Sequence, residues 1–244
     1  MTFLKAVAGR VWCFWALVVF FPTMCVAIVF YMPCFLLREP QKAQWHRQVS
    51  RVWMAFFLFC IGCPIKITGK QYFENHPAYI IICNHNSLLD IPITTPFMPR
   101  ANKTIAKKSM SYIPLFGWIY SFGSVLVDRN NDTSRRASYQ KMRDVLDMGL
   151  DMLIYPEGTR NNTADPLKNF YDGAFKLAAD TGKPILPVVL FNTRKALPRK
   201  RFFYLMPQPL KMDILPPIEV NGKDAKKLKE ESYKLMWDYY KLKA

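Results

Sequence analysis

Several patterns that identify common classes of protein are absent from this sequence. It has no internal repeat and no low-complexity segment, which excludes repeat architectures and compositionally biased linkers. It has no Gly-x-Ser-x-Gly, the motif that places the nucleophile of the usual serine lipases. No carboxylate cluster or Cys/His cluster has the spacing of a metal site, so we expect neither a metal nor a cofactor.

Acidic residues are scarce relative to basic ones. The chain has 34 Lys and Arg against 18 Asp and Glu, which gives a formal net charge of +16. Such an excess favours nucleic acid, anionic lipid surfaces or anionic substrates as partners. The 244 residues suffice for one sizeable domain with an appendage, and a hydrophobic content of 51% supplies its core.

Charge of either sign is missing from residues 11–37. As a continuous helix this run is about 40 Å long, which is more than a bilayer requires. Pro22 divides the run, and three arrangements stay open: a half-embedded hairpin turning at Pro22, a single kinked span, and a signal peptide, although no small-x-small cleavage site follows. Basic residues flank both ends, so the positive-inside rule selects no orientation. We expect residues 1–62 to form membrane-associating helices and residues 63–244 to form the functional domain.

After residue 64, short apolar runs alternate with helical patterns. The expected strands cover 65–68, 78–83, 103–106, 123–127, 151–155 and 184–191, and the expected helices cover 134–148, 172–181 and 224–244. This alternation is typical of an α/β fold with a mixed, largely parallel sheet flanked by helices. The last helix is lysine-rich and amphipathic, and we expect it to dock on the domain with its basic face in solvent.

A polar turn follows the strand expected at 78–83. It contains His85, and Asp90 comes five residues later. Five residues correspond to about 500° of helix, so the two side chains cannot share one helix face. They can meet if His85 lies in the loop and Asp90 in the first turn of the next helix, where the carboxylate can fix the tautomer of a histidine base. The alternative is a capping box with Ser87 as N-cap and Asp90 at N3, and both interpretations are compatible.

Three more polar clusters follow other expected strands. Their candidate binding residues are Lys107 after the strand at 103–106, Arg129 after that at 123–127, and Glu157, Gly158, Thr159 and Arg160 after that at 151–155. Ligands of open α/β sheets bind beyond the carboxyl ends of the strands, so we expect the basic residues near His85. Arg binds phosphate through two parallel hydrogen bonds, and Lys adds a point charge. The sequence therefore predicts chemistry on a phosphorylated lipid.

Four motifs occur in order between about residues 60 and 220. They are Asn84-His85-x4-Asp90, the block from Lys107-Lys108-Ser109 through residues 113–117 to Asp128-Arg129, Pro-Glu-Gly-Thr-Arg at 156–160, and an apolar run around a proline at 185–188. On these motifs the chain resembles the membrane-bound glycerophospholipid acyltransferase family, and within it the bacterial 1-acyl-sn-glycerol-3-phosphate acyltransferases. One departure is Tyr171, where many relatives carry the Lys of Phe-Lys-x-Gly.

The resemblance implies transfer of an acyl chain to the sn-2 hydroxyl of 1-acyl-sn-glycerol 3-phosphate, which yields phosphatidic acid in phospholipid biosynthesis. It implies His85 as general base and Asp90 as its orienting partner, and it assigns the candidate binding residues to the substrate. Glu157 would hydrogen-bond glycerol hydroxyls or orient Arg160, and Ser87 would be an N-cap rather than a nucleophile.

The resemblance also implies partners and a location. The donor would be acyl-CoA or acyl-carrier protein, used as a co-substrate, and the chain would bind an anionic membrane surface but no nucleic acid. The location would be the bacterial inner membrane, with the catalytic domain on its cytoplasmic face. The acceptor could instead be another lysolipid or glycerol 3-phosphate, and a membrane thioesterase or lipase is the remaining alternative.

Overall fold

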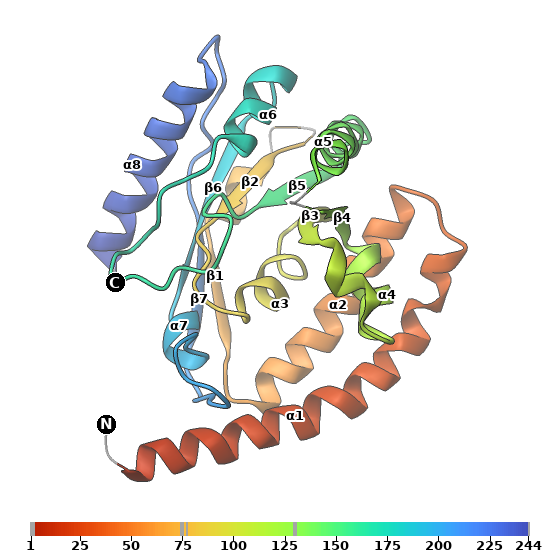
Figure 1. Ribbon diagram of the computed structural model, residues 1–244, viewed down its shortest axis with the longest axis vertical. Coiled ribbons are helices and arrows are strands. Elements are labelled where there is room, and N and C mark those ends of the chain that lie inside the picture. The colour runs from red at the N-terminus through yellow and green to blue at the C-terminus, as the bar shows by residue number, and fades with distance from the viewer. Residues whose placement is uncertain (1–2, 74–75, 77, 129–130, 244) are drawn as a thin grey trace.

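The computed structural model describes residues 3–73, 76, 78–128 and 131–243. Within them the chain forms a seven-stranded sheet in the order β1-β7-β6-β2-β5-β3-β4 (Figure 1). The neighbours β6, β2, β5, β3 and β4 run parallel, β7 is antiparallel to β6, and β1 is parallel to β7. The predicted mixed, largely parallel sheet is confirmed. The strand bounds are Ile65–Thr68 (β1), Ile80–Cys83 (β2), Asn102–Lys107 (β3), Ser124–Val127 (β4), Asp151–Ile154 (β5), Ile185–Phe191 (β6) and Leu210–Ile214 (β7).

The strand β7 is the one that the sequence pattern did not predict. Its five residues include Lys211 and Asp213, and prolines stand on both sides of it, so it lacks the continuous apolar run of a buried strand. The structure explains its charges. Asp213 is buried, pairs with Lys211, and accepts hydrogen bonds from the hydroxyls of Thr68 (2.6 Å) and Tyr239 (2.9 Å). These partners replace the water that the carboxylate loses on burial.

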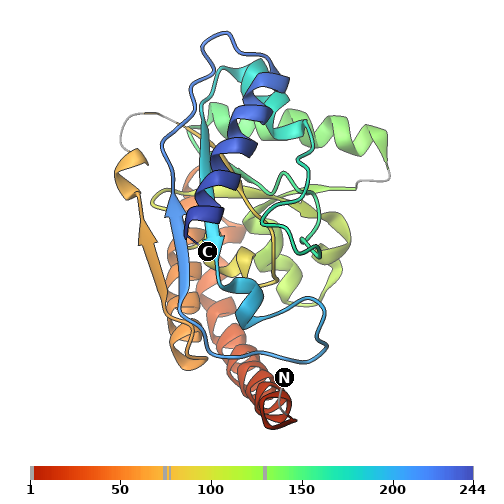
Figure 2. The same ribbon diagram turned by 90° about the vertical axis from the view of Figure 1, so that its left-hand side faces the viewer.

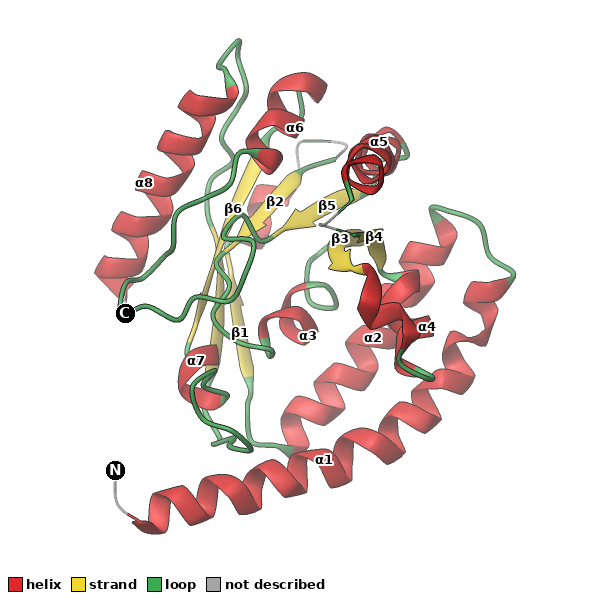
Figure 3. Ribbon diagram, viewed as in Figure 1, coloured by secondary structure: helices red, strands yellow, loops and turns green. Residues whose placement is uncertain are grey.

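Helices cover both faces of the sheet (Figures 1, 2 and 3). The strand β2 shows why: Ile81 and Cys83 point to one face, and Ile80 and Ile82 point to the other. The first face packs with α1, α2 and α3, and the second with α5, α6 and α8. The helix bounds are Phe3–Tyr31 (α1), Gln41–Cys60 (α2), Asp90–Thr94 (α3), Phe116–Phe122 (α4), Asp132–Asp147 (α5), Gly173–Thr181 (α6), Thr193–Ala196 (α7) and Ala225–Lys243 (α8).

The C-terminal helix α8 docks on the domain as expected. Leu228 and Met236 are fully buried, and the helix packs against α6 and β6. Lys226 and Lys227 are exposed at its start. The apolar stripe thus fixes the helix, and the lysines of its outer face stay in solvent.

The N-terminal helix α1 runs without interruption through Pro22, so the hairpin turning at that proline is wrong. The chain reverses later, over residues 32–40, and α2 packs back along α1. Beyond the proline, the Thr23 hydroxyl donates to the carbonyls of Val19 (2.7 Å) and Phe20 (3.1 Å). Together with the residues after it, α1 is long and apolar enough to cross a membrane by length and composition.

Candidate active site

The turn that carries His85 begins at Asn84, directly after β2. The Asn84 side chain is fully buried. Its amide donates to the carbonyl of Leu190 (3.0 Å) and accepts from the backbone N–H of the same residue (2.7 Å). This side chain therefore continues the pairing of β2 with β6 for one more position while the backbone leaves the sheet. The next residue projects from the carboxyl end of β2, where ligands of open α/β sheets bind.

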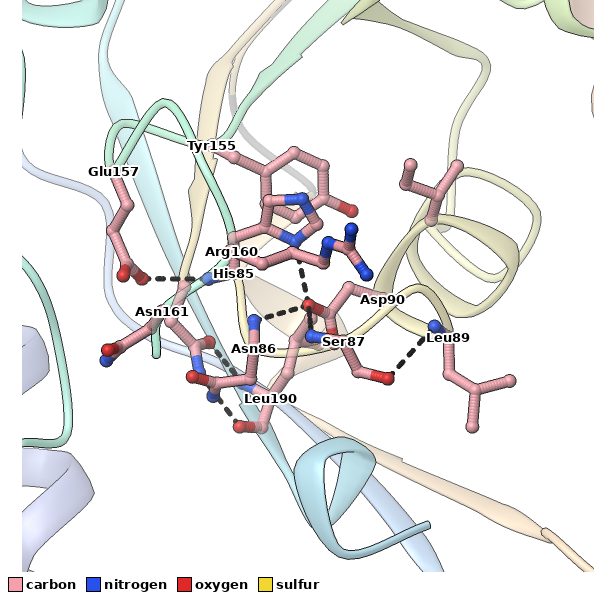
Figure 4. Close-up of polar contacts among 12 residues, drawn as sticks. His85, Asn86, Ser87, Leu89, Asp90, Tyr155, Glu157, Arg160, Asn161 and Leu190 are labelled. Carbon is pink, nitrogen blue, oxygen red and sulfur yellow. Dashed lines mark hydrogen bonds and ion pairs between the residues drawn. The ribbon is translucent and has the colours of Figure 1, made fainter. Parts of the chain in front are cut away.

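His85 and Asp90 meet as their spacing predicts (Figure 4). Nδ1 of His85 lies 2.8 Å from Oδ2 of Asp90, and the same oxygen accepts the backbone N–H groups of Asn86 (2.6 Å) and Ser87 (2.7 Å). The carboxylate is fully buried, whereas 13% of the His85 side chain is exposed. An ionised carboxylate only accepts hydrogen bonds, so Nδ1 carries the proton and Nε2 is the free basic nitrogen.

Ser87 is not the N-cap of the following helix, as one interpretation expected. The helix α3 begins at Asp90, and Leu89 precedes it. The Ser87 hydroxyl accepts from the backbone N–H of Leu89 (3.2 Å) and donates to the carbonyl of Leu197 (2.8 Å). The hydroxyl thereby ties the turn to the segment after α7. Asp90 does bind the backbone N–H of Ser87, so half of the predicted capping box is present.

Tyr155 covers one face of the imidazole. The two rings are stacked, with centroids 4.3 Å apart and planes at 28°. The phenol hydroxyl is 2.7 Å from Oγ1 of Thr94, whose own hydroxyl donates to the backbone carbonyl of Asp90 (2.8 Å). Burial raises the pKa of Tyr155 well above its ordinary value, so the phenol stays neutral. His85 is held at one edge by Asp90 and on one face by Tyr155, a contact that the sequence pattern did not reveal.

Glu157 is buried against the His85 turn. Its side chain is fully buried, Oε1 accepts the backbone N–H of His85 (2.8 Å), and Oε2 accepts that of Lys168 (3.1 Å). Burial raises the pKa of this carboxyl to about 7. The carboxylate therefore joins the His85 turn to the loop that leads to α6.

The loop after β5 brings a cation to Thr159. Gly158 has a positive φ of 69°, and a Cβ there would lie 2.7 Å from the ring of Tyr171, so glycine suits both the backbone and the contact. Tyr171 itself is 69% exposed. The ammonium of Lys168 donates to the hydroxyl of Thr159 (2.7 Å). Lys168 thus places a positive charge at Thr159, in the loop that precedes Arg160.

The other predicted cations are less close together. The half-buried Arg160 extends in the direction of the His85–Asp90 pair (Figure 4), and among the described residues its guanidinium has no hydrogen bond or ion pair. Lys107 is exposed at the carboxyl end of β3. That strand is two positions from β2, or about 10 Å at the usual spacing. Arg129 lies outside the described residues.

Arg194, which the sequence analysis did not select, connects the His85 turn to the loop that follows β5. Its Nη2 donates to Oδ1 of Asn86 (3.1 Å) and to the carbonyl of Asn161 (3.3 Å), and its Nη1 donates to the carbonyl of Thr163 (2.9 Å). The backbone N–H of Asn161 donates in turn to the carbonyl of His85 (2.6 Å). The rule that selected the other clusters, polar residues after a strand, would have found Arg194 after the strand at 184–191.

This arrangement has the parts of a proton-transfer site. A histidine with a fixed tautomer is held by a buried carboxylate, and a half-buried arginine lies on the same side of the sheet. In the described part of the chain, no group of three or more His, Cys, Asp or Glu side chains could hold a metal ion. The geometry suits a base that takes a proton at Nε2 while Asp90 balances the resulting positive charge.

Comparison with known proteins gives the family. The model of the Acyltransferase family matches residues 64–191, just over half of the chain. Proteins named 1-acyl-sn-glycerol-3-phosphate acyltransferase match from Cocos nucifera (34% identical, 70% of this chain and 55% of that protein) and from Saccharomyces cerevisiae (34% identical, 66% and 53%). The chain thus spans about half the length of these relatives. The namesake from Salmonella typhimurium is 32% identical over 67% of this chain and 66% of its own length.

A solved structure supports the fold. The crystal structure of the 1-acyl-sn-glycerophosphate acyltransferase from Thermotoga maritima superposes with a TM-score of 0.81 and covers 98% of each chain, at 20% identity. Its architecture is therefore the same from the N-terminal helices to the last helix. Because the family model covers more than half of the sequence, this chain belongs to the Acyltransferase family.

Proposed function

We propose that this chain transfers an acyl group from acyl-CoA or acyl-carrier protein to the sn-2 hydroxyl of 1-acyl-sn-glycerol 3-phosphate, forming phosphatidic acid for phospholipid biosynthesis. The observation that carries the proposal is the pair of His85 and the buried Asp90 at the carboxyl end of β2. The names of the relatives supply the acceptor, and the family supplies the reaction class.

The proposed step is a direct transfer. Nε2 of His85 takes the proton of the sn-2 hydroxyl while the oxygen attacks the thioester carbonyl. The resulting tetrahedral intermediate collapses with cleavage of the carbon–sulfur bond, and the thiolate leaves with the proton that His85 returns. Asp90 keeps the imidazole in the reactive tautomer and stabilises its charged form. The acceptor hydroxyl is the nucleophile, and the thioester brings an activated acyl group, so the reaction requires neither a nucleophilic serine nor a cofactor.

The cations of the site are proposed to bind the acceptor phosphate. Arg160 is the first choice, because its guanidinium extends toward His85 and has no partner among the described side chains. Lys107 and Arg129 are the further candidates after neighbouring strands, and Thr159 and Gly158 line the loop that precedes Arg160. Paired hydrogen bonds from a guanidinium suit a phosphate monoester.

The N-terminal helices are proposed to hold the enzyme on a membrane. Residues 1–62 form the membrane-associating part and residues 63–244 the catalytic part. Support comes from the apolar side chains that α1 exposes, and from a net charge of +16 that favours an anionic surface. The corresponding location is the cytoplasmic face of a membrane, which in a bacterial cell is the inner membrane.

The first experiment measures thiol release from palmitoyl-CoA and from palmitoyl-acyl-carrier protein, with and without 1-acyl-sn-glycerol 3-phosphate. We expect release that requires the acceptor, together with formation of phosphatidic acid. Release without an acceptor would identify a thioesterase. A panel with glycerol 3-phosphate and a lyso-ornithine lipid tests the alternative acceptors, and faster turnover of either would replace the proposed one.

Replacing Arg160 with alanine is expected to raise the KM for 1-acyl-sn-glycerol 3-phosphate by about tenfold or more, because hydrogen bonds to a charged group contribute about 1.5–3 kcal/mol. The kcat should change less, since the phosphate is bound equally in the ground and transition states. Steady-state kinetics with 1-acylglycerol, which lacks the phosphate, provide the comparison. The matched control is Arg136→Ala on the exposed side of α5. An equal loss with both acceptors would rule out phosphate binding by Arg160.

A further inference from the structure

The segment between α7 and β7 exposes both cationic and aromatic side chains. It reads Pro198-Arg199-Lys200-Arg201-Phe202-Phe203, and Arg199 and Lys200 are exposed. Phe202 is 95% exposed, more than any other large apolar side chain in the described part of the chain. A fully exposed phenylalanine beside consecutive basic residues is typical of a surface that meets an interface, where the ring leaves water and the cations stay in it. We call residues 198–203 the basic-aromatic loop.

The backbone holds this loop in an unfavourable conformation. Phe203 has a positive φ of 48°, which is a genuine outlier for a bulky side chain. The two phenylalanine rings are neighbours, with centroids 6.4 Å apart. Strain of this kind persists where the surrounding structure enforces it, and it is concentrated at functional segments. Here it maintains a loop in which Phe203 is partly covered (37% exposed) and Phe202 buries almost none of its ring within the protein.

One end of the loop is attached to the candidate active site. The hydroxyl of Ser87, in the turn of His85, donates to the carbonyl of Leu197 (2.8 Å). The Arg199 guanidinium donates to the backbone carbonyl of Arg160. The loop is therefore hydrogen-bonded both to the catalytic turn and to the backbone of the arginine that we propose to bind the acceptor phosphate.

The other end is attached to α1. The backbone N–H of Leu205 donates to the carbonyl of Gly9 (3.0 Å), and the ring of Tyr204 lies against Gly9 so closely that no side chain would fit there. The Arg201 guanidinium stacks over Tyr204, 4.9 Å from the ring centroid. Figures 1 and 2 both show the loop beside the N-terminal part of α1. That part exposes apolar side chains, among them Phe3 (81%) and Leu4 (78%).

We propose that the basic-aromatic loop binds the interfacial region of an anionic lipid bilayer, with the Phe202 ring among the acyl chains and Lys200 at the lipid phosphates. The inference rests on the membrane association put forward under Proposed function and extends it to a second contact. Because the loop continues the exposed apolar surface of α1 and is bonded to the active-site turn, the contact sets the distance between the His85 site and the bilayer that holds the acceptor.

An acidic carrier protein is the other partner that a basic loop could attract. The observations favour lipid for two reasons. The most exposed group of the loop is the apolar Phe202, and the loop is continuous with the apolar surface of α1 rather than with the lysine-rich α8. A bilayer accommodates both the aromatic ring and the cations. Each basic residue raises the affinity for an anionic surface by about tenfold or less. Binding of the carrier protein is therefore an outcome of the test.

Tryptophan at position 202 reports the depth of the loop directly. The Phe202→Trp variant and the wild type are placed in phosphatidylcholine/phosphatidylglycerol vesicles whose acyl chains are brominated near the headgroup. We expect the brominated lipid to quench the additional emission that the variant shows relative to the wild type. Leu242→Trp, at the exposed end of α8 (77% exposed), should add unquenched emission. The wild-type signal includes Trp15 of α1 and Trp118 of α4, both partly exposed, and reports membrane association itself.

The outcomes separate the two proposals. If the wild-type emission is quenched and the added emission of Phe202→Trp is not, the membrane association stands and the loop contact is overturned. If neither is quenched, the membrane association fails and the loop contact fails with it. If both emissions are quenched, the membrane association and the loop contact are both supported.

Activity gives an independent readout. Phe202→Ala and Lys200→Gln are expected to lower kcat/KM about fivefold on acceptor presented in anionic vesicles, because each removes one contact with the interface. Neither should alter it in neutral detergent micelles. Lys226→Gln, at another exposed lysine, near the start of α8, is the matched charge control and should have no effect. A loss that Lys200→Gln shows with acyl-carrier protein as donor, but not with acyl-CoA, would identify the loop as a protein-docking site. Unchanged activity on vesicles for both loop variants would also overturn the inference.

Discussion

Replacing His85 with alanine is expected to lower kcat by about 10³-fold, the range of a positioned general base. The physical reason is that Nε2 is the one basic nitrogen that the site prepares, since Nδ1 is bound by Asp90 at 2.8 Å. The alanine variant should fold. Both backbone hydrogen bonds of residue 85, to Glu157 and from Asn161, are retained, and the Asp90 carboxylate keeps two backbone donors. Acceptor-dependent thiol release measures the effect.

The matched control is His76→Ala, because His76 precedes β2 at the opposite end of the strand from His85. It should retain wild-type turnover and thermal stability. Full acceptor-dependent activity in His85→Ala would show that another group takes the hydroxyl proton, and the direct-transfer mechanism would then have to be abandoned. A variant that loses its cooperative thermal transition would instead indicate that the imidazole is needed for folding, so the two measurements are made on the same preparation.

The sequence predicts the contact between residues that are close along the chain, but it does not predict the contacts between distant residues of the site. His85 and Asp90 are five residues apart, so the strand-turn-helix pattern alone predicts that they meet. Arg194 contacts Asn86 across a separation of 108 residues, and nothing in either neighbourhood specifies that pairing. Tyr155 looks like the last residue of a strand, and only the adjacency of β2 and β5 places its ring on His85.

Two elements of the fold show the same limit. Six strands of the sheet are predictable from apolar or alternating runs with turns after them, but β7 carries Lys211 and Asp213, whose partners Thr68 and Tyr239 come from distant parts of the chain. Pro22 is a helix breaker by intrinsic preference, yet α1 continues through it. Packing of α1 against α2, with Trp53 donating to Thr23 just beyond the proline, outweighs the local preference.

Replacing Glu157 with glutamine is expected to lower kcat by about 10²-fold while changing the acceptor KM little. The carboxylate accepts the backbone N–H groups of His85 and Lys168, and a glutamine amide can accept only one of them. The other N–H then faces an NH₂ group, which leaves a buried donor unpaired at about 1–3 kcal/mol. A displacement of the His85 turn by about 1 Å is enough for a loss of this size. Steady-state kinetics at fixed pH separate kcat from KM.

The same substitution should change how stability depends on pH. Burial raises the pKa of Glu157 from 4.5 to about 7, so the folded protein binds this proton more tightly than the unfolded chain. The carboxyl therefore stabilises the fold below pH 4.5 relative to higher pH, and this contribution is lost as the pH rises through about 7. Its size is at most about 3 kcal/mol. The difference in Tm between wild type and Glu157→Gln, measured in detergent, should be several degrees larger at pH 5 than at pH 8.

These two readouts distinguish a positioning residue from one that binds the acceptor. If Glu157 hydrogen-bonded the glycerol hydroxyls, the glutamine variant would raise the acceptor KM and change kcat less. If it positions the His85 turn from beneath, as its burial and its two backbone partners indicate, kcat falls and the Tm difference shrinks toward high pH. Lys168 provides a further check, because its ammonium binds Thr159 on the far side of the same loop. Lys168→Met retains the backbone N–H that Glu157 accepts but removes a cation that lowers the pKa of Glu157, so it should shift the fall in Tm to higher pH.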